Sequence, residues 1–346
     1  MSDRPAGDFK TTYVQDMAIL DTRFYRIGFL CLLGALTLAP LWLGRFIFVL
    51  NAIGIFAIGA CGLTLLTGFT GQISLGHAAF MAIGAYASAL LTQAWRLPFI
   101  VALPLATTIT FVCGIVVGLP SLRIKGLYLA IATLAFQFLT EYAIIHATGG
   151  IGAISVAPAS IFGWTIRTER QFYYLLLVVW VTSAVFAANL VRSRVGLTLM
   201  AVRDRDYAAQ VLGINLLFYK TLAFGLAASY AGIAGSLWAH YSRLLTTEQF
   251  TIGQSIDYVA MVVIGGLTSI WGPHLGATVV VLLSQGLKIM TPVLVRVVPA
   301  FGQIATPLRE IAFGVTLIGL LIWEPGGVAM LFKKLKRLLN LWPFAY

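Results

Sequence analysis

The sequence predicts an all-α membrane protein, a polytopic bundle of about ten transmembrane helices. Of its 346 residues, 60% are hydrophobic and only 10% are charged, and the mean hydropathy is +0.92. A soluble domain carries roughly 25% charged residues. The apolar runs are continuous rather than alternating, which favours helices, because strands of a membrane barrel alternate lipid-facing and lumen-facing residues.

The span positions follow from the length that a helix needs to cross a bilayer. About 20 mostly apolar residues suffice, because each adds about 1.5 Å across a core about 30 Å thick. We expect an N-terminal tail at 1–26, one transmembrane domain at 27–332 and a basic tail at 333–346. The first span should be retained as an anchor, since its context differs from that of a cleavable signal peptide. The predicted spans are 27–43, 46–66, 76–94, 98–118, 126–146, 171–191, 216–240, 255–270, 274–290 and 308–323.

The distribution of Lys and Arg predicts the orientation. Fifteen of the 23 fall in the N-terminal tail, at 123–125, at 192–220 and in the C-terminal tail, which a ten-span topology places on one side. Basic loops stay cytoplasmic, so both termini should be cytoplasmic. Nucleic-acid binders instead gather their basic residues on one face. The net charge of +11 therefore indicates the lipid bilayer and not nucleic acid as a partner.

One helix-compatible segment, 195–214, cannot span the membrane because it carries four consecutive charged residues. These are Arg203, Asp204, Arg205 and Asp206. Val195, Leu199, Val202 and Tyr207 recur at three-to-four spacing, which predicts an amphipathic helix lying along the cytoplasmic surface. Gly213 should end this helix. The helix either contacts a cytoplasmic partner or is anchored to lipid alone.

The stretch 62–91 combines glycines and polar residues at the expected junction of two spans. Backbone without helical hydrogen bonds is tolerated in a membrane only where protein or a water-filled cavity covers it, and broken helices often form transport paths. Thr67, Gln72, Ser74 and His77 are the candidate pathway residues. Gly68, Gly71 and Gly76 are interpreted as helix-packing or hinge positions. His77 could instead donate a hydrogen bond to a backbone carbonyl, and a lone His predicts no metal site.

A weaker echo of this stretch occupies 265–277, GGLTSIWGPHLGA, where Gly265 and Gly266 are further packing or hinge candidates. Paired interruptions suggest an internal repeat around a central site, although the spacing differs between the two copies. Glu141 and Asp257 fall near the outer ends of their spans, and both are candidate pathway residues at its outer mouth. No acidic residue or Lys falls at mid-span, which argues against an ion-coupled carrier.

Several separate motifs occur in an order that resembles a known family. They are GFTGQISLGHAAFMAIGAY, GLYLAIATLAF, SRVGLTLMAVRDRDYAAQVLGINLLFYKTLAFGLAASYAGIAGSLWA, MVVIGGLTSIWGPHLGA and EPGGVAML. Together they resemble the LivM type of branched-chain amino acid permease of ATP-binding cassette (ABC) transporters, over roughly residues 50–332. The resemblance implies a subunit that imports such amino acids into a bacterial cell by alternating access, in the plasma membrane. Its partners would be ATPase subunits, a second permease and an extracytoplasmic solute-binding protein.

The resemblance also implies how an ATPase is contacted. Permeases of ABC importers carry a cytoplasmic coupling helix with a Glu-Ala-Ala, three residues, Gly pattern. Ala208, Ala209 and Gly213 match this spacing, while Tyr207 stands where the acidic residue would be. The polar contact is therefore expected from the charged run at 203–206.

The sequence itself carries no nucleotide-binding or hydrolytic motif. It lacks the GxxxxGK[ST] phosphate loop, the G-x-S-x-G elbow and the H-E-x-x-H pair. We therefore expect a transport subunit and not an enzyme, without cofactor or metal, whose ATP is bound by a partner. Urea, amides and sugars remain alternative solutes, because permeases for them resemble this chain too. A secondary carrier or channel working without an ATPase is the other alternative.

Overall fold

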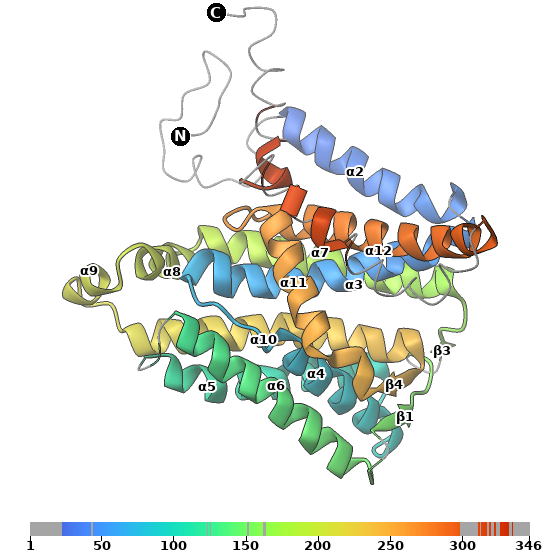
Figure 1. Cartoon of the computed structure of the whole chain (residues 1–346), viewed down its shortest axis with the longest axis horizontal. Helices are drawn as coiled ribbons and strands as arrows, with labels where there is room; N and C mark the ends of the chain where they lie inside the picture. Colours follow the sequence, from blue (N-terminus) through green and yellow to red (C-terminus); the bar gives the residue numbers. More distant parts are fainter. Residues whose placement is uncertain are drawn as a thin grey trace, which may run out of the picture.

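A computed structural model describes residues 23–42, 44–122, 124, 126–150, 152–161 and 164–297, with scattered positions between 311 and 334. Helices dominate these ranges (Figure 1). The α-helices are α2 (Arg23–Trp42), α3 (Ile47–Leu63), α4 (His77–Gln93), α5 (Phe99–Gly118), α6 (Leu127–Ala147), α7 (Glu169–Arg192), α8 (Arg194–Asp204), α9 (Asp206–Val211), α10 (Leu216–Ser242), α11 (Ile252–Gly265) and α12 (Gly272–Val297). Shorter helical turns are η1 (Gly44–Phe46), the π-helix η2 (Thr64–Gly68), η3 (Leu119–Leu122) and η4 (Thr247–Phe250).

The predicted polytopic helical bundle is confirmed. In the described part, five helices are long and apolar enough to span a membrane, and α2 adds a shorter apolar stretch. They are Ile47–Gly68, Phe99–Gly118, Leu127–Ala147, Glu169–Arg192 and Leu216–Ser242. The predicted third and eighth spans are the shorter helices α4 and α11, of 17 and 14 residues. The predicted tenth span, 308–323, is described only at scattered positions, which are helical, and most of both predicted tails lie outside the described residues.

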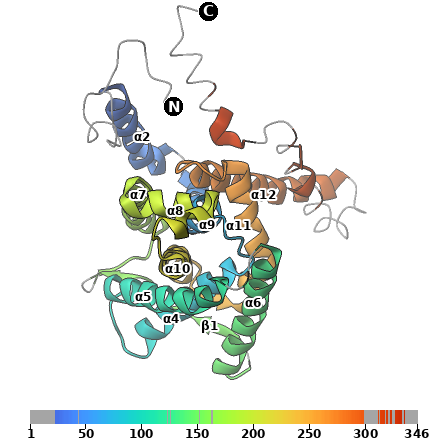
Figure 2. The same cartoon turned by 90° about the vertical axis from the view of Figure 1, so that its left-hand side faces the viewer.

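Two helices form the centre of the bundle. The apolar window of α3 and η2 is 89% buried and that of α10 is 72% buried, whereas the windows of α5, α6 and α7 are 22–33% buried. The α3 sequence is apolar all round, as expected of a helix enclosed by others. The helix α10 packs against α3, α4 and α5, and Figure 2, seen from the α8 and α9 end, shows α4 and α5 beside it. The peripheral helices keep apolar faces available to lipid.

Small residues let α10 approach its neighbours closely. A Cβ atom at Gly84 of α4 would fall on the backbone of Gly232 in α10, and one at Gly232 would fall on Thr110 of α5. Packing of this kind replaces the hydrophobic effect between helices in lipid, because lipid tails are as apolar as the side chains. It explains why α4, α5 and α10 form one tightly packed layer.

Short strands close the end of the bundle opposite α9 (Figure 1). β1 (Ala153–Ser155) pairs antiparallel with β4 (Leu244–Thr246), and β2 (Ser160–Ile161) pairs with β3 (Trp164–Thr165). Side chains from the helices fasten this connection, since Tyr86 Oη donates to the Gly152 carbonyl at 2.6 Å and His240 Nδ1 donates to the Ala157 carbonyl at 2.9 Å. Strands of two or three residues leave no period in the sequence, so they were not predicted.

The amphipathic segment differs from the expectation of one helix. It forms two helices, α8 and α9, that meet at Arg205, whose backbone is extended at φ −153° and ψ 93°. Leu199 and Val202 are buried as predicted, but Tyr207 is 75% exposed. The break resets the helical phase, so Tyr207 does not share the buried face. The predicted end at Gly213 is confirmed, since that residue has φ +84° just after α9.

Candidate functional site

The candidate site is a break between α3 and α4. The helical run that begins at α3 passes through the π-helix η2, and residues 71–76 are not helical. An α-helix rises about 1.5 Å per residue, so the 17 residues of α4 cover about 25 Å, short of a core about 30 Å thick. Figure 1 shows the connecting segment running from the α3 end beside α8 toward the middle of the bundle. The break therefore lies within the protein and not in a surface loop.

Burial alternates along this segment. Gln72 is 6% exposed and Ser74 is fully buried, whereas Gly71 is exposed and Ile73 is 44% exposed. Alternation of this kind is expected of extended backbone, in which successive side chains point to opposite sides. The predicted pathway residues Gln72 and Ser74 thus lie on the enclosed side. The accessible side carries Ile73, which sequence reasoning did not select.

The Gln72 carboxamide stands out among the buried polar groups. Neither its Nε2 nor its Oε1 atom has a hydrogen-bond partner among the residues that the structure describes. Its backbone is well held, because Gln72 N donates to the Leu66 carbonyl at 3.2 Å and Thr67 Oγ1 donates to the Gln72 carbonyl at 3.1 Å. An unpaired buried amide costs about 1–3 kcal/mol, so its presence calls for a reason other than stability.

Ser74 and His77 are bonded locally. Ser74 Oγ accepts from the amide of Gly76 at 3.4 Å. His77 is fully buried at the start of α4, and its Nε2 lies 2.8 Å from the Gly59 carbonyl of α3. Because a carbonyl only accepts, Nε2 carries the proton. His77 thus makes the backbone hydrogen bond that the sequence left open as an alternative to a pathway role.

A buried polar network from α6 and α11 surrounds the break. Ser255 Oγ accepts from the Ala78 amide at 3.0 Å and donates to Gln137 Oε1 at 3.4 Å, while Gln137 Nε2 donates to the Phe250 carbonyl. One turn earlier on α6, Thr133 Oγ1 accepts from the Leu75 amide at 3.0 Å. These bonds satisfy backbone donors freed by the break. Sequence reasoning missed this network, although a Gln in the middle of a predicted span was a usable signal.

Glu141 and Asp257 lie farther along the same two helices. Glu141 is one turn after Gln137 on α6 and lines a narrow cavity between α4, α6 and η4. Asp257 follows Ser255 by two residues on α11 and is half-buried. Thr67, Gln72, Ser74 and His77 therefore share one stretch of chain, while Glu141 and Asp257 stand on its neighbours. Their role at the outer mouth stays a prediction.

A second helix break, at residues 266–271 between α11 and α12, lies against the first. A Cβ atom at Gly68 would collide with the Leu267 carbonyl of the second break. A Cβ atom at Gly76 would collide with the Thr133 carbonyl of α6. Gly265 approaches the Gly272 backbone in the same way, and Gly266 has φ +107°. All these positions exclude larger side chains on steric grounds. Whether the glycines also act as hinges stays a prediction.

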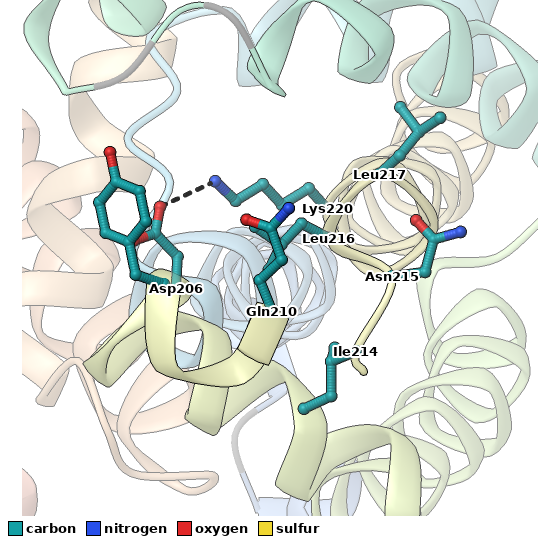
Figure 3. A pocket seen from close by; sticks show the side chains of 8 residues that line it. Asp206, Gln210, Ile214, Asn215, Leu216, Leu217 and Lys220 are labelled. Carbon is teal, nitrogen blue, oxygen red and sulfur yellow. Dashed lines mark ion pairs between the residues drawn. The ribbon is translucent and has the colours of Figure 1, made fainter. Parts of the chain in front are cut away.

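The charged run at 203–206 mostly contacts this chain itself, which differs from the expectation of partner-facing charges. Arg203 Nη1 donates to the Gly68 carbonyl at 2.9 Å, and its Nη2 is 2.8 Å from Asp204 Oδ1. Asp206 Oδ2 is 3.6 Å from Nζ of Lys220 in α10 (Figure 3). Arg205 is exposed. The physical reason is that Arg203 and Asp206 are next to the ends of α3 and α10, where polar partners stand.

The tip of α9 is apolar and exposed. Val211 is 88% exposed, Leu212 81% and Tyr207 75%, and Ala208 is exposed too. Ala209 is only 2% exposed and packs inside the chain, so it is not on the accessible surface of α9, and its role in ATPase coupling stays a prediction. Beside the tip is a hollow of about 390 Å³ (Figure 3). It is lined by Asp206, Tyr207, Gln210, Ile214, Asn215, Leu216, Leu217 and Lys220.

Comparison with known proteins decides the family. Residues 45–321 match the family described as "Branched-chain amino acid transport system / permease component". The chain belongs to this family. It is therefore a multi-pass permease of the ABC importer class, as the motifs indicated. Among the described residues, no group of three His, Cys, Asp or Glu side chains could hold a metal ion.

Individual relatives agree with this family. The chain is 30% identical over 301 residues to the high-affinity branched-chain amino acid permease protein LivM of Salmonella typhimurium, covering 79% of this chain and 67% of the relative. It is 29% identical over 313 residues to LivM of Escherichia coli, covering 83% and 70%. The ribose import permease RbsC of Escherichia coli is 28% identical over 258 residues, covering 70% and 77%. No solved structure matches.

Proposed function

We propose that this chain is a permease subunit that imports branched-chain or related amino acids by alternating access, in a bacterial plasma membrane. It acts with a second permease chain, ATPase subunits that bind ATP, and an extracytoplasmic solute-binding protein. Both termini are cytoplasmic in this proposal, because α8 and α9 then face the ATPase. The chain itself supplies no enzymatic activity and holds no cofactor.

The observation that carries the proposal is the meeting of two helix breaks beneath the α8–α9 pair. Gly68 at the first break abuts the Leu267 carbonyl at the second, and Arg203 of α8 donates a hydrogen bond to the Gly68 carbonyl. Broken helices that face each other are typical of the substrate paths of transporters. The α8–α9 pair lies beside the two breaks and could therefore transmit movement of a bound partner to them.

The α9 tip is the surface we propose for ATPase docking. Apolar surface is exposed there by Tyr207, Val211 and Leu212. A partner that covers these side chains removes their apolar surface from water, which favours binding. Full burial of an aliphatic side chain contributes about 1.5–3 kcal/mol. The exposed charge of Arg205 would then orient the contact and not dominate its affinity.

Variants of the α9 tip test the docking proposal. We expect Val211→Asp with Leu212→Asp to weaken ATPase binding by at least about 100-fold, because the burial of two apolar side chains, about 3–6 kcal/mol in all, is lost. Leu197→Asp is the matched control, since Leu197 is 46% exposed on α8 away from the tip. Co-purification of the ATPase subunits measures the effect. Equal retention of the ATPase by both variants would contradict the assignment of the tip.

Reconstituted vesicles test the importer as a whole. Uptake should require ATP, the ATPase subunits and the solute-binding protein together. Uptake that persists after the ATPase subunits are removed would show a secondary carrier or channel instead.

The solute is tested separately, by calorimetric titration of the cognate binding protein with leucine, isoleucine, valine, urea, an amide and ribose. We expect a branched-chain amino acid to bind most tightly. Preferential binding of urea, an amide or ribose would replace the proposed solute while leaving the mechanism in place.

A further inference from the structure

We infer that Arg203 is the positioning residue that links movement of α8 and α9 to the helix break at residues 71–76. The inference rests on the proposed function, because it assumes that an ATPase moves this helix pair. Arg203 Nη1 donates to the Gly68 carbonyl at 2.9 Å, across a separation of 135 residues in sequence.

The guanidinium of Arg203 is held in place from its other side. Its Nε and Nη2 lie 2.9 and 2.8 Å from the same oxygen of Asp204, leaving Nη1 to reach Gly68. Arg is suited to this arrangement because its planar fork offers several donors in fixed directions. The Gly68 carbonyl is available because it ends the π-helix η2, and carbonyls in the last turn of a helix have no partner within it.

The stem of Arg203 also fills space that a glycine leaves open. A Cβ atom at Gly71 would lie 3.0 Å from Arg203 Cγ, and Gly71 has φ +70°, a conformation that favours glycine. Arg203 therefore touches both ends of the short stretch that turns away from α3. Displacement of its side chain would move or release residues 68–71.

Gly68 connects this contact to the second break. Its Cα faces the Leu267 carbonyl so closely that no side chain fits between them. Apolar packing supports the same junction, since Leu199 of α8 and Leu66 of η2 share a buried cluster with Phe224 of α10. The apolar cluster holds α8 against the bundle, and the directional hydrogen bond of Arg203 reaches the point where the two breaks meet.

The test compares Arg203→Met with Arg194→Met in the complete reconstituted transporter. Met keeps an unbranched stem but has no donor, and Arg194 is an exposed arginine at the start of the same helix, α8. We expect Arg203→Met to bind the ATPase normally and to hydrolyse ATP, while uptake per ATP hydrolysed falls at least tenfold. Arg203→Lys, which retains one donor, should recover part of the uptake. Arg194→Met should keep the wild-type ratio of uptake to hydrolysis.

A second measurement separates transmission from simple stability. With Ile73→Cys as the only cysteine, we expect ATP to change the rate of thiol labelling in the otherwise wild-type complex and to leave it unchanged when Arg203→Met is added. An unchanged uptake ratio in Arg203→Met, or an ATP-dependent labelling rate that survives it, overturns the inference. Loss of ATPase binding would overturn it too, by making Arg203 a docking residue. ATP-independent uptake by the wild-type complex would instead refute the proposed function.

Discussion

The unpaired carboxamide of Gln72 yields a prediction in which stability and transport move in opposite directions. Gln72→Met keeps the length of the side chain and removes both polar atoms, neither of which is hydrogen-bonded within the described residues. An unsatisfied buried polar group costs about 1–3 kcal/mol. The substitution should therefore stabilise the protein by about 1–3 kcal/mol.

Transport should fall in the same variant. If Gln72 meets the solute when the path opens, its amide supplies a hydrogen bond that Met cannot replace. A hydrogen bond to a charged group is worth about 1.5–3 kcal/mol, which corresponds to a loss in uptake rate of roughly 10-fold to 100-fold.

Gln137→Met is the matched control. The chemical change is the same, but here both polar atoms of the carboxamide are hydrogen-bonded, Oε1 to the Ser255 hydroxyl and Nε2 to the Phe250 carbonyl. That variant should be destabilised by about 1–3 kcal/mol, because the Phe250 carbonyl loses its donor. Thermal unfolding of the detergent-solubilised complex and uptake into vesicles measure the two effects. Destabilisation of Gln72→Met to the extent seen in Gln137→Met would refute the reasoning.

Two further predictions concern the fold alone. Gly84→Val should greatly lower the amount of protein inserted in the membrane, because the valine side chain would collide with the Gly232 backbone. Gly286→Ala should be tolerated, since a Cβ atom there meets nothing within 4 Å. Immunoblots of membrane fractions measure the amounts of both variants, and equal amounts would contradict the packing described. Thr168→Ala should destabilise the start of α7 by about 1 kcal/mol, because Thr168 and Gln171 form a capping box; an unfolding midpoint unchanged within error would show that the cap contributes nothing.

Local properties of the chain made the broad architecture predictable. Hydrophobicity over about 20 residues identifies a spanning helix whatever surrounds it, so the apolar runs and the charged segment at 195–214 could be recognised directly. Glycine and polar residues within an apolar run likewise indicated the break near residues 71–76. The end of α9 at Gly213 was predictable for the same reason, since a glycine with φ +84° depends on its own backbone.

Orientation of side chains was decided by tertiary contacts. Gln72 and Ser74 were selected for their polarity, but only the fold shows that both are buried and that the exposed position between them is Ile73. Ala209 matched a family pattern yet packs inside the chain.

The charged run of the α8–α9 pair shows most clearly what composition determines and what tertiary contacts decide. Composition alone determined that this segment stays outside the membrane, because burying its charges in lipid is too costly. Only the fold decided that Arg203 turns inward and donates to the carbonyl of Gly68, which precedes it by 135 positions in the sequence. The reason is physical, since the direction in which a side chain finds its partner is set by segments distant in sequence, which no local pattern encodes.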